Sequence, residues 1–329
     1  MKHLLLSLLC ASAFTYACSN KDDNTDPETD PEPDYDVTYQ ASDFIRDNLA
    51  AAKTTFQCQV SEEPTELTLD NGVKLTIPGG NVFTKNGVPI TGAYTLEINT
   101  MLKPSEVLLS GTNTNYRGGG YLVTDGFFHV NVLQNNVSVD TNLSEFISIS
   151  IPTDKADGTS TWIWEGDVED GQFAWKEPGA DVVSRSVVIG PNIIFANNKN
   201  FNFRFKKLGW YNCDVLPPGG NQTTVSAELT GQTGEFSSFW GGTGNTFVFF
   251  VVDSMLLQLY TEVNATTVQS YDNSIPVGME GTLLAFSIKD GLYSYAAKKV
   301  KIIANLRETL NLLPVTKEEL IAKLEELDK

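Results

Sequence analysis

Residues 67–98 read LTLDNGVKLTIPGGNVFTKNGVPITGAYTLEI, and this stretch decides the fold class. Apolar and polar side chains alternate in residues 67–69 and 73–77, which is the pattern of strands with one buried face. Asn71-Gly72 stands between the two runs, and Asn-Gly pairs favour the positive φ angles of a tight hairpin turn. The stretch therefore predicts antiparallel β-hairpins.

Short runs of the same kind continue along the rest of the chain. They occupy residues 127–133, 146–151, 201–205, 246–252, 256–260, 282–288 and 299–303. Strands at such short spacing, without long helical segments between them, predict an all-β protein built from β-sandwiches. A polar run at residues 196–202 (ANNKNFN) interrupts the strands. We therefore expect two tandem Ig-like β-sandwich domains, residues 37–198 and residues 199–329.

Two segments depart from the strand pattern. Residues 42–53 (SDFIRDNLAAAK) place apolar side chains at helical spacing. In residues 316–327 (TKEELIAKLEEL), Thr316 and Glu319 have the spacing of a helix-capping box. We expect one short N-terminal helix before the first sandwich and one short C-terminal helix after the second.

Residues 67–98 also resemble the opening of the β-sandwich domain shared by ankyrins and netrin receptors, in which a strand ending in Ile-Pro-Gly precedes a strand begun by Gly. Together with residues 209–214 (GWYNCD), they are similar to uncharacterised surface-exposed lipoproteins of Bacteroides-type bacteria. The resemblance implies a β-sandwich for the first domain and brings no known ligand. Some eukaryotic relatives of this sandwich cleave themselves at a His-Phe-Ser site. Here His129 is followed by Val130 and Asn131, so that reaction is not implied.

The N-terminus has the pattern of a bacterial lipoprotein. Residues 4–14 (LLLSLLCASAF) form an apolar run that is too short to span a bilayer and fits the core of a secretory signal peptide. Ala17-Cys18 follows and resembles a lipobox, which predicts a signal peptide at residues 1–17 and lipidation of Cys18. The alternative is ordinary secretion with cleavage after Ala13, which would leave Cys18 as a free thiol.

Residues 18–36 are expected to form a lipidated and disordered tether. Residues 19–36 (SNKDDNTDPETDPEPDYD) hold eight acidic residues and three prolines, and such a stretch cannot bury enough apolar surface to become ordered. Residues 19–23 (SNKDD) resemble the acidic export signal that follows the lipidated Cys in Bacteroides-type lipoproteins. The resemblance implies a protein anchored in the outer membrane and facing the cell exterior.

Composition and motifs exclude several functional classes. The formal net charge is −18, and Lys and Arg form no long cluster, so we expect no nucleic-acid partner. An acidic body is repelled by anionic headgroups, which leaves the lipid anchor as the means of membrane attachment.

Apart from His3 in the signal segment, His129 is the only histidine, and the chain has no G-x-S-x-G motif. We therefore predict no catalytic residues, no metal site, no cofactor and no enzymatic activity.

Cys58 and Cys213 are the two cysteines that follow the tether. Compartments outside the inner membrane permit disulfides, so one possibility is a bridge between these residues that clamps the two domains together. The other possibility is two buried thiols that pack as small apolar residues.

Three tryptophans and one serine are the remaining candidate sites. All five tryptophans, which include Trp210 and Trp240, have the chemistry to stack on a sugar ring, and Trp162, Trp164 and Trp175 are the candidates for such a platform. Tryptophans in a sandwich more often fill the core. Asp253-Ser254-Met255 fits a short acceptor pattern for O-glycosylation at Ser254 in these bacteria.

These features favour a non-catalytic cell-surface lipoprotein with a structural or protein-interaction role. The alternative is a surface glycan-binding protein that serves polysaccharide uptake, and a hydrolase with an unrecognised site is a third reading. The expected partners are the membrane, reached through the lipid anchor, and either another surface protein or a polysaccharide.

Overall fold

The computed structural model of the protein describes residues 38–179, 182–184, 192–215, 220–231, 234–238, 241–253 and 255–329. The described residues from Thr38 to Lys329 form one compact unit. Strands make up 55% of the structure and helices 11%, so the predicted all-β class with a few short helices is confirmed.

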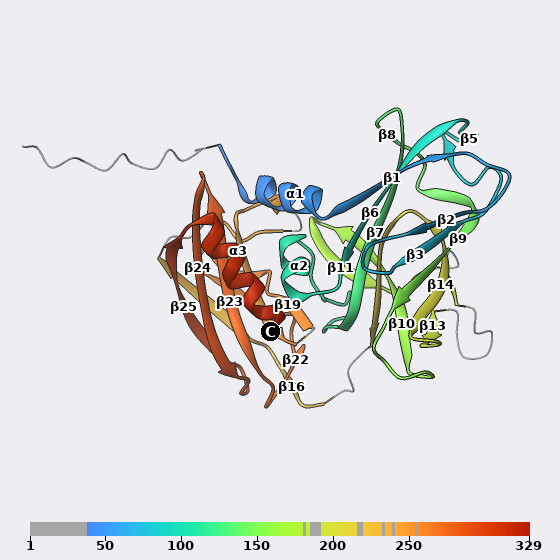
Figure 1. The fold of residues 1–329 in the computed structure, drawn as a ribbon. Coiled ribbons are helices and arrows are strands. Elements are labelled where there is room, and N and C mark those ends of the chain that lie inside the picture. The colour runs from blue at the N-terminus through green and yellow to red at the C-terminus, as the bar shows by residue number, and fades with distance from the viewer. Residues whose placement is uncertain are drawn as a thin grey trace, which may run out of the picture. The chain divides into compact units, whose positions relative to one another are not determined.

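Three large sheets build this unit (Figure 1). The central sheet has the strand order β1 (Lys53–Gln59), β6 (Ala93–Met101), β7 (Val123–Gln134), β15 (Gly209–Val215), β10 (Ser160–Glu169) and β11 (Gln172–Lys176). Two short strands extend it, β8 (Val137–Ser138) beside β7 and β13 (Ile193–Phe195) beside β10. The outer sheet has the order β12 (Val182–Ser184), β14 (Asn200–Lys207), β9 (Asn142–Pro152), β3 (Lys74–Ile77) and β2 (Thr65–Thr68).

The C-terminal sheet is formed by later residues. Its order is β19 (Met255–Gln258), β18 (Thr246–Val252), β23 (Glu280–Lys289), β24 (Leu292–Lys301), β25 (Arg307–Val315), β17 (Ser226–Gly231), β21 (Thr267–Gln269) and β20 (Thr261–Asn264). Two small ribbons complete the strands, β4 (Thr84–Lys85) with β5 (Val88–Pro89) and β16 (Gln222–Thr223) with β22 (Ile275–Pro276).

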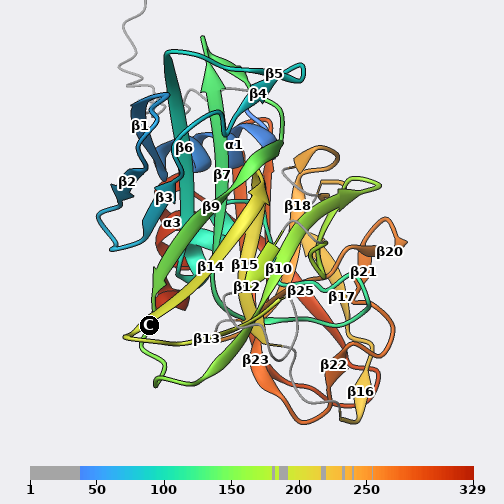
Figure 2. The ribbon, with the colours of Figure 1, turned by 90° about the vertical axis from the view of Figure 1, so that its right-hand side faces the viewer.

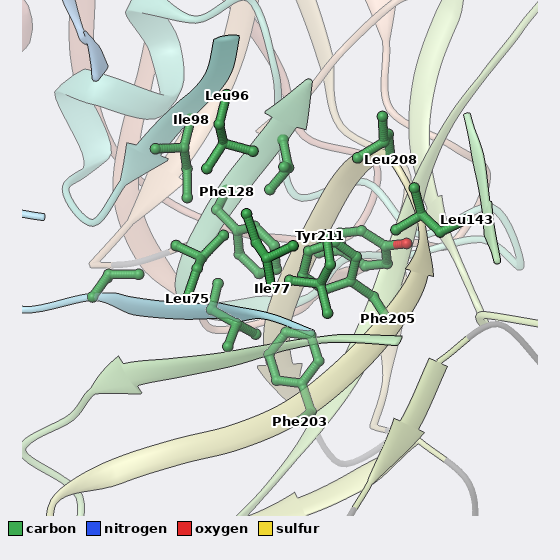
Figure 3. Packing of buried hydrophobic residues seen from close by; sticks show 14 of the residues in the cluster. Leu75, Ile77, Leu96, Ile98, Phe128, Leu143, Phe203, Phe205, Leu208 and Tyr211 are labelled. Carbon is green, nitrogen blue, oxygen red and sulfur yellow. The ribbon is translucent and has the colours of Figure 1, made fainter. Parts of the chain in front are cut away.

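The outer sheet covers one face of the central sheet. Figure 2 shows β9 and β14 crossing in front of β6 and β7. Between the two sheets, the rings of Phe128 and Tyr211 stack with centroids 5.3 Å apart, and Phe203 and Phe205 approach them from β14 (Figure 3). Each of these rings is almost fully buried, and such burial is the main favourable contribution to folding.

The polar run expected to mark a domain boundary forms a hairpin turn instead. Asn197 pairs with Asn200, and the two residues between them, Asn198 and Lys199, have φ angles of 50° and 58°. Positive φ at two successive residues is the geometry of a tight hairpin connection, which Asn favours. Because β14 then pairs with β9, and β15 with β7 and β10, the first two sheets extend to Val215, beyond the boundary expected at residue 198.

Three helices lie between the central sheet and the C-terminal sheet (Figure 1). They are α1 (Ala41–Ala51), α2 (Pro104–Leu109) and α3 (Lys317–Glu325), and a short 3₁₀ turn, η2 (Glu326–Asp328), follows α3. Their buried side chains, such as Phe44 and Leu320, share one core with Phe127 of the central sheet and Phe247 and Phe286 of the C-terminal sheet. The helices therefore form the layer that joins the two parts of the chain.

The two predicted helices are confirmed, and α2 was not predicted. The capping box of α3 is present, since Glu319 N–H donates to Thr316 Oγ1 at 3.1 Å and Thr316 N–H donates to Glu319 Oε2 at 2.8 Å. α2 has only six residues, too few for a helical period to be recognised in the sequence. Within the part of the chain that the structure describes, no helix has the length and apolar character needed to cross a membrane.

A buried polar seam links the central sheet to the C-terminal sheet. It consists of residues 112–115 and Gln258, whose side chains are all at most 2% exposed. Asn115 Nδ2 donates to the carbonyl oxygen of Gln258 at 2.9 Å, and the Gln258 N–H donates to Asn115 Oδ1 at 2.8 Å. On the other side, Trp175 N–H donates to the Asn115 carbonyl oxygen at 2.8 Å. The seam thus joins β11 to β19 by paired hydrogen bonds that water does not reach.

Candidate functional site

The predicted tryptophan platform is largely buried. Trp164 and Trp175 expose none of their surface, and both belong to the core that the three helices share with the central sheet and the C-terminal sheet. Trp164 makes an edge contact with Tyr116 at 5.2 Å between ring centroids, and the Trp175 Nε1–H donates to the Asn113 carbonyl oxygen at 2.7 Å. Trp162 is half-buried and stacks on Trp164 at 5.9 Å. Of the three indoles, only Trp162 is partly exposed.

The two cysteines of the body are free, which corrects the possible disulfide. Cys58 lies on β1 and Cys213 on β15, and both are buried. β6 and β7 separate them within the central sheet. Three inter-strand spacings amount to roughly 14 Å, about twice the Cα separation that a disulfide tolerates. Burial raises the pKa of both thiols, so they pack as small apolar residues and react slowly.

Two predicted modification sites, Cys18 and Ser254, lie outside the described residues, as does Trp240. Lipidation of Cys18 and O-glycosylation of Ser254 therefore remain predictions.

A largely apolar hollow lies between α1 and the central sheet, and we name it the α1 groove. Its volume is about 570 Å³, and the residues that line it include Ile45, Leu49 and Ala50 of α1. Concave sites of this size with mostly apolar walls are typical of ligand pockets. Ile45 is buried against the core while Ala50 is exposed, so the lining contributed by α1 runs from the core to the molecular surface.

The floor of the groove is one row of side chains on three neighbouring strands. Asn99 of β6 pairs with His129 of β7, and His129 pairs with Trp210 of β15. Paired residues of an antiparallel sheet lie about 5 Å apart on the same face, so the three side chains are neighbours. The imidazole of His129 lies against the indole of Trp210 with ring centroids 4.7 Å apart.

His129 is an uncharged group at neutral pH. Burial lowers the pKa of His129 to about 4, and the negative charge of Glu97 opposes this shift only in part. A neutral imidazole offers one N–H donor and one nitrogen acceptor. Among the residues that the structure describes, neither ring nitrogen makes a hydrogen bond. The imidazole is therefore free to bind a ligand through both nitrogens.

The charged groups around the groove are paired with one another. Lys53 Nζ lies 2.5 Å from Glu97 Oε1, and Asn131 Nδ2 donates to the other Glu97 oxygen at 3.2 Å. Arg46 also lines the groove and pairs with Asp43 at 2.7 Å. Asn99 Nδ2 donates to the carbonyl oxygen of Leu49 at 2.8 Å and so ties the end of α1 to the sheet. The groove is thus apolar and electrically balanced.

A buried carboxyl group lies elsewhere on the central sheet. Asp214 of β15 exposes none of its surface, and Asn212 donates a short hydrogen bond to one of its oxygens while the other has no partner. Burial raises the pKa of Asp214 well above its usual range, and the nearby charge of Asp125 adds to the effect. Across the described ranges, no three His, Cys, Asp or Glu side chains gather as a metal ion would require.

Sequence reasoning missed the α1 groove. His129 and Trp210 stand 81 positions apart, and only the insertion of β15 beside β7 brings them together. His129 was a signal in the sequence, but a single histidine predicts neither a catalytic nor a metal site. Comparison with protein-family models, curated proteins and solved structures found no match to this chain.

Proposed function

We propose that this chain is a non-catalytic lipoprotein of the outer membrane that faces the cell exterior and works by binding. The observation that carries the binding role is the α1 groove, where a neutral His129 lies against Trp210 between apolar walls. Concave, mostly apolar sites with a few polar groups are those that hold ligands.

The groups in the groove favour binding over chemistry. A general base needs a nucleophile or a water-activating partner within hydrogen-bond reach. In the described part of the chain, no hydroxyl or thiol is hydrogen-bonded to His129, and Glu97 is already engaged by Lys53 and Asn131. A pKa of about 4 also makes this imidazole a weak base.

The proposed location at the outer membrane is supported by the sequence and not by the fold. An apolar signal segment ends at Cys18, and the acidic residues 19–36 follow it directly. Two or three acyl chains on one Cys anchor a protein stably without help from surface charge.

Cell fractionation and surface proteolysis test the proposal. We expect protease added to intact cells to digest the body, and we expect Cys18→Ala to release the protein from the membrane fraction. The matched control is Cys10→Ala, which changes a cysteine inside the same signal segment and should leave the protein anchored. A body protected until the outer membrane is opened, or a Cys18→Ala protein that stays membrane-bound, would overturn the location and the anchor.

A further inference from the structure

We propose that the α1 groove binds an uncharged compound with a flat aromatic ring and a single hydrogen-bonding edge. The ring is expected to lie against the Trp210–His129 pair, and its polar edge is expected to meet His129 and Asn99. This inference rests on the proposed binding role and names the chemical class of the ligand.

The shape and lining of the groove favour a ring. Trp210, of which 7% is exposed, and His129 adjoin each other in the lining of the groove, and the opposite wall is formed by Leu49 and Ala50 of α1. Aromatic groups prefer offset or tilted contacts with other rings, and apolar walls exclude water from the faces of a bound ring. A volume of about 570 Å³ accommodates a ligand of one or two fused rings with space to spare.

The charges favour a neutral ligand. Lys53 and Glu97 neutralise each other, and Arg46, which also lines the groove, is paired with Asp43. A charged ligand would have to break one of these pairs or remain unpaired against apolar walls, and both alternatives are unfavourable.

The number of free polar groups favours an aromatic compound over a sugar. His129 offers one donor and one acceptor, and Asn99 Oδ1 is a further acceptor, since the Asn99 amide nitrogen is already bonded to Leu49. A phenol or an indole has one polar group to satisfy. A pyranose has four or more hydroxyls, and each hydroxyl that leaves water without a partner opposes binding.

Titration of the purified full chain with four small probes tests the inference. The probes are indole, which is neutral; tryptamine, which carries a positive charge; indole-3-acetate, which carries a negative charge; and methyl β-glucoside, a neutral sugar. We expect indole to bind, both charged indoles to bind at least about tenfold more weakly, and the glucoside to give no signal.

Two variants on α1 locate the bound probe. Ala50 lines the groove and is exposed, so Ala50→Phe fills the groove without disturbing the core, and we expect indole affinity to fall at least about tenfold. Ala51 is also exposed but does not line the groove, so Ala51→Phe is the matched control and should leave affinity unchanged. Unchanged melting temperatures in both variants would show that folding is intact.

The outcomes separate the two proposals. No binding of indole, or equal binding by both variants, would overturn the inference. If the glucoside bound and Ala50→Phe abolished that binding, the inference of an aromatic ligand would also be overturned. The proposed binding role of the α1 groove would then still stand. Surface proteolysis and the Cys18→Ala experiment test the anchored surface location whatever the probes show.

Discussion

The side-chain amide of Asn113 donates a hydrogen bond of 2.9 Å to Oε1 of Gln258, 145 residues later in the chain. Both side chains are buried, and the same Gln258 amide donates to the Ser237 carbonyl oxygen at 3.2 Å. One glutamine therefore links the loop after α2 to the C-terminal sheet. This contact lies in the polar seam that holds together the two parts of the body.

Replacing Gln258 by Leu tests the importance of the seam. The variant keeps the side-chain volume but leaves buried polar groups of Asn113 and Ser237 without that partner. We expect the free energy of unfolding to fall by about 1 to 3 kcal/mol, measured by urea denaturation. Gln59→Leu is the control, because Gln59 is exposed on β1. Equal effects of the two substitutions would contradict the role given to the seam.

Asp214→Asn is expected to stabilise the protein at neutral and alkaline pH. Burial raises the pKa of Asp214, so the folded state favours the protonated carboxyl more than the unfolded state does. The contribution of Asp214 to the free energy of unfolding is therefore fully present below the unfolded pKa of about 3.9. It is lost as pH rises toward the pKa of the folded state. Melting temperatures should show an advantage of Asp214→Asn at pH 8 that shrinks toward pH 4.

The exposed Asp154 provides the comparison for that measurement. Asp154→Asn should have little effect on melting temperature at any pH in this range. An Asp214→Asn protein that is less stable than the unchanged chain at pH 8 would mean that the Asp214 carboxylate is ionised and stabilising.

His129 should remain uncharged until the pH falls close to 4. The folded pKa of about 4 lies below the ordinary value of 6.5, so the unfolded state binds a proton first as pH falls. The contribution of His129 to the free energy of unfolding is fully present above pH 6.5, and it is lost as pH falls from 6.5 toward 4. The titration of the imidazole C–H resonance by NMR, assigned by its loss in His129→Gln, measures this pKa directly. A midpoint near 6.5 would show that the imidazole is hydrated.

Both buried cysteines are expected to be recovered as free thiols. Alkylation under denaturing, non-reducing conditions followed by peptide mapping should find Cys58 and Cys213 modified separately. Alkylation of the folded protein should be much slower, because burial raises the pKa of both thiols. A disulfide-linked pair of peptides would require the order of strands in the central sheet to be different.

Local features of the fold were predictable from sequence. The turn predicted at Asn71-Gly72 connects β2 to β3, because a tight turn depends mainly on the residues within it. Gly72 has the expected positive φ, 85°, whereas Asn71 does not. The start of α3 at Thr316 was predictable for the same reason.

Features that depend on strand order were not predictable. Nothing near Trp210 in the sequence indicates that β15 enters the central sheet between β7 and β10, yet that pairing places Trp210 beside His129 and Cys213 away from Cys58. The same pairing buries Trp164, which alternation alone could place on either face of a sheet. The α1 groove was therefore missed, and a disulfide remained an open possibility.

The mass of the intact protein extracted from cell membranes tests the lipid anchor most directly. We expect a chain that begins at Cys18 and carries the additional mass of a diacylglyceryl group and an N-linked acyl chain. A chain that begins at Phe14 and carries no acyl mass would contradict the account.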